Sequence, residues 1–88
     1  MQLGGSVVKA GLDVSVRQIK DARKLLDWSA RELSERAGLH ERSIQRIEIT
    51  PATFEKMAIG NVRRIVRVLE DAGIEFLSDG NVRRIQGS

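Results

Sequence analysis

The feature that most constrains how this chain folds is Gly38, which separates two short segments of helical spacing. Leu33 and Ala37 share one face before it, and Ile44 and Ile47 share one face after it. Because glycine accepts a positive φ without strain, the chain can reverse within the few residues between the segments. The sequence therefore predicts two short helices packed across a tight turn, with small and apolar side chains where they cross.

A further helix is expected before this pair. Ser15 is a suitable N-cap, and the helical spacing continues to about Asp27. The expected apolar stripe of this helix consists of Ile19, Ala22, Leu25 and Leu26. Ser29 then begins the second helix with a capping box, because Glu32 stands three residues later.

The expected third helix spans residues 41–48, with His40 at its cap position. Pro51 interrupts the helical pattern, and a short helical turn is expected in the loop that follows it. Asn61 is a suitable N-cap for a last helix that leads to Gly73.

Beyond the helices, segments 74–77 and 82–85 flank an Asp-Gly turn signal and predict a β-hairpin. Its expected apolar face consists of Ile74, Phe76, Val82 and Ile85. Residues 60–65 recur unchanged as residues 80–85, and we expect the first copy in a helix and the second in a strand. Because an isolated hairpin is only marginally stable, it must pack on the helices or pair with the edge of another copy.

The composition excludes several functional classes. Without cysteine and with one histidine, the chain cannot form disulfides, zinc ribbons, thiol nucleophiles or multi-histidine metal sites. Neither paired carboxylates nor a phosphate-binding loop is evident, so we expect no enzyme activity, no metal and no cofactor. Two Phe, one Trp and no Tyr are too few for a platform that stacks single-stranded bases. The net charge of +3 is compatible with an anionic partner.

The expected organisation is an N-terminal tail or short edge strand over residues 1–14, a helical domain over 15–73 and a hairpin segment over 74–88. No apolar run approaches the roughly 20 residues that a bilayer span needs, so no membrane partner is expected. The N-terminus also lacks the pattern of a secretory signal. We therefore expect a cytoplasmic protein, associated with the nucleoid.

Several motifs within residues 19–73 occur together: Trp28-Ser29, Leu33, Ala37-Gly38-Leu39, Ser43-Ile44 and Arg46-Ile47-Glu48. In these the chain resembles the lambda-repressor/Cro type of helix-turn-helix protein, also called the xenobiotic-response-element family. The resemblance implies a mainly α, lambda-repressor-like bundle of four to five short helices, here followed by a short C-terminal β-hairpin. Two positions depart from the family pattern. Ala30 stands where Gln is common, and Ile49-Thr50-Pro51 replaces a turn that contains Gly.

The resemblance implies that the third helix lies in the major groove of double-stranded DNA. The side chains expected to read bases are Glu41, Arg42, Ser43, Gln45 and Arg46. Arg suits guanine and Gln suits adenine. Glu41 could accept a hydrogen bond from cytosine, orient a neighbouring Arg or repel phosphates. For the arginines, the alternative is an ordinary solvated surface.

Phosphate contacts are expected at the starts of the second and last helices, where backbone N–H groups point outward. The expected phosphate-positioning residues are Lys20, Ser29, Arg31, His40, Lys56, Asn61, Arg63 and Arg64. For Arg63 and Arg64 a solvated helix face is the alternative. The resemblance also implies a scaffold ion pair between Arg23 and Glu48, and a core position for Trp28.

Together these inferences favour a sequence-specific regulator of transcription that binds double-stranded DNA, a repressor that dimerises through its hairpin. One alternative is an antitoxin, which would add a toxin as protein partner. Another is a protein-interaction module that keeps the fold without binding DNA, which Ala30 and Glu41 would favour. Strong, salt-dependent binding to duplex DNA would exclude that module.

Overall fold

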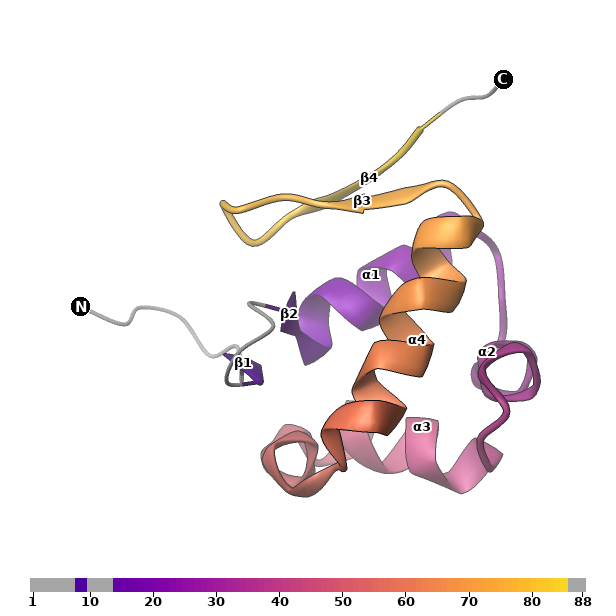
Figure 1. Ribbon diagram of the computed structural model, residues 1–88, viewed down its shortest axis with the longest axis vertical. Coiled ribbons are helices and arrows are strands. Elements are labelled where there is room, and N and C mark those ends of the chain that lie inside the picture. Colours follow the sequence, from indigo (N-terminus) through magenta and orange to yellow (C-terminus); the bar gives the residue numbers. More distant parts are fainter. Residues whose placement is uncertain (1–7, 10–13, 86–88) are drawn as a thin grey trace.

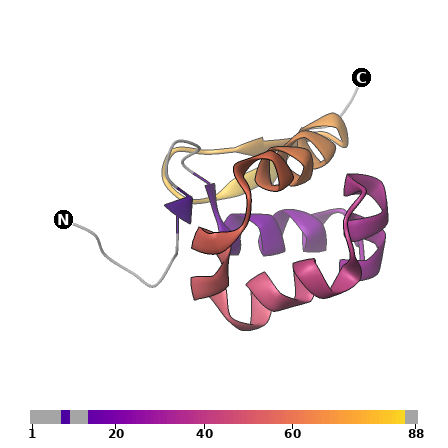
Figure 2. The ribbon, with the colours of Figure 1, turned by 60° about the horizontal axis from the view of Figure 1, so that its bottom comes forward.

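The computed structural model describes residues 8–9 and 14–85. In chain order the elements are β1 (Val8–Lys9), β2 (Val14–Ser15), α1 (Val16–Leu25), α2 (Ala30–Ala37), α3 (Glu41–Ile49), the 3-10 helix η1 (Pro51–Lys56), α4 (Ile59–Asp71), β3 (Ile74–Phe76) and β4 (Val82–Arg84). The helices form one bundle, and the β3–β4 hairpin crosses the end of the bundle that lies opposite α3 (Figures 1 and 2). The expected mainly helical fold with a C-terminal hairpin is confirmed.

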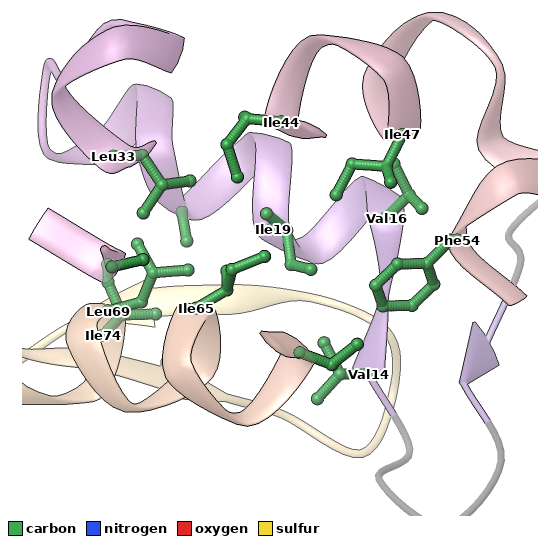
Figure 3. Packing of buried hydrophobic residues seen from close by; sticks show 13 residues of the cluster. Val14, Val16, Ile19, Leu33, Ile44, Ile47, Phe54, Ile65, Leu69 and Ile74 are labelled. Carbon is green, nitrogen blue, oxygen red and sulfur yellow. The ribbon is translucent and has the colours of Figure 1, made fainter. Parts of the chain in front are cut away.

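One apolar core holds the helices together. Its buried side chains come from every helix, as Figure 3 shows for most of them. They are Val14, Val16, Ile19, Ala22, Leu33, Ala37, Ile44, Ile47, Phe54, Val62, Ile65, Leu69 and Ile74. Within the longer helices these residues recur at three- and four-residue spacing, which gives each helix one inward stripe. For α3, the inward stripe is Ile44 and Ile47, so the opposite face of this helix is left to solvent.

The start of α1 is fixed by a capping box that also holds the hairpin. The Gln18 N–H donates to Ser15 Oγ at 3.1 Å, and the Ser15 N–H donates to Gln18 Oε1 at 3.0 Å. Gln18 Nε2 donates to the carbonyls of Leu77 and Asn81, both at 3.1 Å. The sequence indicated Ser15 as a cap, but it gave no signal that the buried Gln18 amide joins α1 to the hairpin turn.

The hairpin packs on α1 and α4. Its antiparallel register pairs Ile74 with Arg84 and Phe76 with Val82. Ile74 is buried, but Ile85 is 54% exposed, so the expected placement of Ile85 on the apolar face is wrong. Val82 and Ile85 are three residues apart, and strand residues an odd number apart point to opposite faces.

The expected apolar stripe of α1 is wrong at Leu25, which is 45% exposed. Each residue turns a helix by about 100°, so Leu25 lies about 120° from Ile19, whereas Leu26 returns to within about 20° of it. Leu26 accordingly packs against the core.

The expected N-cap of the last helix is also wrong. Helix α4 begins at Ile59 with Ala58 at the N-cap, and Asn61 lies within its first turn. The Asn61 N–H donates to the Ala58 carbonyl at 2.9 Å. Val62 and Ile65 are both buried on the inward face of α4. The helix itself begins about one turn earlier than the Asn61 signal suggested.

Candidate nucleic-acid interface

Helices α2 and α3 are joined by a tight turn whose backbone is fixed at Gly38. This residue has φ +72° and ψ +33°, in the left-handed region. The N–H groups of Gly38 and Leu39 donate to the carbonyls of Glu35 and Ser34 at 3.3 and 2.8 Å. His40 occupies the N-cap position of α3, but its side chain makes no capping hydrogen bond. The turn therefore orients α3 through backbone contacts.

A largely buried ion pair fixes α3 against α1. Arg23 Nε and Nη2 donate to the Glu48 carboxylate oxygens at 2.9 and 2.8 Å. The remaining Nη1 donates to the Trp28 carbonyl at 2.8 Å. The two side chains are only 14% and 10% exposed. The scaffold pair implied by the resemblance is present, and it holds the far end of α3 in place.

The face of α3 that points away from the core carries Arg42, Gln45 and Arg46, all exposed. Gln45 Nε2 donates to Glu41 Oε2 at 3.1 Å, so two of the side chains expected to read bases are joined to each other. Within the described part of the chain, the guanidinium groups of Arg42 and Arg46 make no hydrogen bond or ion pair. Figure 2 shows α3 along one edge of the molecule, where a long ligand can reach this face.

Beside this face, α3, η1 and the start of α4 enclose an open hollow of about 790 Å³. Its lining consists of His40, Arg42, Ser43, Arg46, Ile47, Thr53, Lys56, Met57, Ala58 and Asn61. Three of these residues are cationic, and none of the described residues that line the hollow carries a carboxylate. The hollow therefore suits an anionic group such as phosphate. It brings together six of the side chains expected to contact DNA, which come from three separate elements.

The start of α2 is arranged differently from this hollow. Ser29 Oγ accepts the Glu32 N–H at 3.0 Å, as an N-cap does. The Glu32 carboxylate bonds Arg36 at 2.7 Å instead of returning to the cap, so only half of the expected capping box forms. Arg31 is paired with Glu35 at 3.2 Å and is exposed.

The structure does not bring Lys20, Arg63 or Arg64 into the hollow. Arg64 lies instead beside Gly38, in a smaller hollow of about 360 Å³ between α2 and α4 that also contains Asp71. Arg64 is thus close to the turn of the α2–α3 pair but on the α4 side of it.

Thr53 is a site residue that the sequence analysis missed. Its Oγ1 hydroxyl lies 2.8 Å from the Thr50 carbonyl and 3.3 Å from the Arg46 carbonyl, at the end of α3. A hydroxyl residue shortly after Pro51 is a turn signal that could have indicated this role. Thr53 closes the C-terminal end of α3 and lines the hollow.

Among residues 8–9 and 14–85 we find no group of three or more His, Cys, Asp or Glu side chains that could hold a metal ion. In the same part of the chain, each helix is too short or too polar to cross a membrane.

Comparison with known families agrees with this geometry. The profile of a helix-turn-helix family matches residues 19–58, which include α2, the turn and α3. The curated proteins and the solved structures give no match. The matched family is one of DNA-binding regulatory domains and is not a family of enzymes. Residues 19–58 are therefore similar to a helix-turn-helix domain of the lambda-repressor/Cro type, the DNA-binding family also called the xenobiotic-response-element family.

Proposed function

We propose that the protein is a sequence-specific regulator of transcription, a repressor that reads the DNA major groove with α3. The observation that carries this proposal is the position of the cationic hollow directly beside the outward face of α3. Base edges and the phosphates that flank them lie next to each other in a duplex, and this surface offers donors for both. A domain bound at this groove would block access for other proteins, and repression follows where its site overlaps one that those proteins need. We place it in the cytoplasm, at the nucleoid.

In this proposal, Arg42 and Arg46 bond guanine O6 and N7, and Gln45 bonds adenine. Gln45 must first release Glu41, whose carboxylate then accepts from cytosine or orients an arginine. Ser43 serves a base or a phosphate at the edge of the hollow.

Phosphate positioning is proposed for the remaining polar groups of the hollow, His40, Lys56 and Asn61. The outlying residues Lys20, Ser29, Arg31, Arg63 and Arg64 would contact the backbone on either side of the base-reading helix. For Arg31 this contact requires breaking its exposed ion pair with Glu35, which costs little.

The test is selection of bound duplexes from a random pool, followed by replacement of Arg42 and Arg46 with alanine together. Each guanine contact is worth about 1–3 kcal/mol, so the double variant should bind the selected duplex at least about 30-fold more weakly. The affinity is measured by fluorescence anisotropy at fixed salt.

A matched control removes two positive charges elsewhere, at Arg17 and Arg67, which lie on α1 and α4 outside the hollow. This control should retain most of the affinity and all of the sequence preference. Equal losses of affinity in the two double variants would show that the binding is nonspecific electrostatic attraction. Failure to recover any duplex at low salt would instead favour the protein-interaction module or an antitoxin that depends on its toxin.

We further propose that the protein forms a homodimer through residues 74–88, which would place two copies of α3 on successive half-sites. The N–H groups of Ile85 and Leu77 bond the carbonyls of Gly73 and Asn81. By the alternation of an antiparallel ladder, the backbone groups of Val82 and Arg84 then point away from β3, toward a possible partner strand. The exposed Ile85 adds apolar surface to this segment.

Sedimentation equilibrium should therefore give about twice the monomer mass of 9.8 kDa, and Ile85→Glu should shift the protein toward monomer. Ile49→Glu serves as the control, because Ile49 is also exposed but lies on α3, at the end of the molecule opposite the hairpin (Figure 1), and this variant should leave the mass unchanged. A monomeric mass for the unsubstituted protein at high concentration would rule out this interface.

A further inference from the structure

Ile49 is an unusually exposed apolar side chain on the helix that the proposed function places in the groove. It is the last residue of α3. Its exposed fraction is 79%, well above the 41–54% of the other exposed large hydrophobic residues in the described part of the chain.

Ile49 continues the outward stripe of α3. It stands seven residues after Arg42, four after Gln45 and three after Arg46, and such residues share one face of a helix. Ile44 and Ile47 are buried on the opposite face. The stripe that would face DNA therefore begins with polar side chains and ends with an apolar one.

Packing within the bundle does not explain the isoleucine. A side chain exposed to 79% buries little surface, and a β-branched residue is a weaker helix former than alanine. The backbone at this point is held independently, because the Thr50 N–H donates to the Arg46 carbonyl at 2.8 Å and Thr53 closes the same turn. Folding alone would be served as well by a smaller or polar residue.

We infer that Ile49 is a specificity residue that contacts the C5-methyl group of a thymine in the major groove. This inference rests on the proposed function of α3. The thymine methyl is the apolar group that the major groove presents, and apolar side chains distinguish thymine by contact with it. Seven residues of helix span about 10 Å, which corresponds to about three base steps of a duplex. The thymine should therefore lie about three base pairs from the base read by Arg42.

The experiment uses the full chain and the duplex obtained by selection. Each thymine of a half-site is replaced in turn by deoxyuridine, which lacks only the C5-methyl group. For the unsubstituted protein, one such replacement about three base pairs from the Arg42 position should weaken binding about fourfold, as expected for one buried methyl group. In Ile49→Ala the same replacement should have no effect.

Leu25→Ala is the matched control, because it shortens an exposed apolar side chain on α1. This variant should keep the full preference for thymine over deoxyuridine. The inference is overturned if the selected half-site lacks a thymine at this distance, if deoxyuridine binds equally well, or if Ile49→Ala retains the preference. In each of these cases the duplex is still bound, so the proposed function stands; recovery of no duplex at all overturns both.

Discussion

Replacing Glu48 with alanine is expected to lower the free energy of unfolding by about 3–5 kcal/mol. The substitution leaves the Arg23 guanidinium, only 14% exposed, without the carboxylate that accepts two of its hydrogen bonds. A charge left unpaired in such a position costs much more than the pair contributes as a whole. Urea denaturation followed by circular dichroism measures the loss.

Two further variants separate the ion pair from ordinary surface charge. Glu35→Ala breaks an exposed pair with Arg31 and should change the free energy of unfolding by less than about 1 kcal/mol. Replacing Arg23 with methionine and Glu48 with leucine together removes both charges and should recover most of the stability lost in Glu48→Ala. A loss below about 1 kcal/mol in Glu48→Ala itself would show that the pair does not hold α3.

Phe54→Ala is the second substitution with a large expected effect, a destabilisation of about 3–5 kcal/mol. Phe54 is fully buried and is the core side chain that η1 contributes. Its removal leaves a cavity between η1 and the helices, and it also loosens the segment that carries Lys56 and Thr53 beside α3. Thermal denaturation should show a melting temperature lower by more than about 10 °C, because each kcal/mol shifts a domain of this size by about 4–8 °C.

Phe54→Leu keeps most of the apolar volume and should cost less than Phe54→Ala. Ile59→Ala, at a 41% exposed position that begins the next helix, should cost less still. If Phe54→Ala melts within a few degrees of the unsubstituted protein, η1 is not anchored by this side chain, and the hollow beside α3 has another support.

The sequence was most informative where the structure depends on residues that are close together along the chain. The turn at Gly38 and the buried pair Ile44 and Ile47 follow from local spacing and glycine geometry. The same helical spacing placed Arg42 and Arg46 on the outward face of α3. Arg23 and Glu48 lie 25 residues apart in the sequence, and only the family resemblance indicated the ion pair between them.

Some errors were of local spacing, whereas the features that the sequence did not indicate depend on packing between distant segments. Ile85 was assigned to the apolar face by its residue type, but its distance from Val82 along the strand turns it outward. Gln18 looks like an ordinary polar helix residue, yet its amide is buried against a turn about 60 residues later. The hollow beside α3 could not be derived either, because it depends on how η1 and the start of α4 return to α3.

The hairpin and α3 lie at opposite ends of the molecule (Figure 1). A protein that docks on the hairpin would therefore leave α3 accessible, and both ligands could be bound in one ternary complex. The protein on the hairpin and the DNA on α3 would therefore not compete for the same surface. Any influence of one on the other would be an allosteric coupling transmitted through α1 and α4, on which the hairpin packs, and by thermodynamic reciprocity it would be equal in both directions.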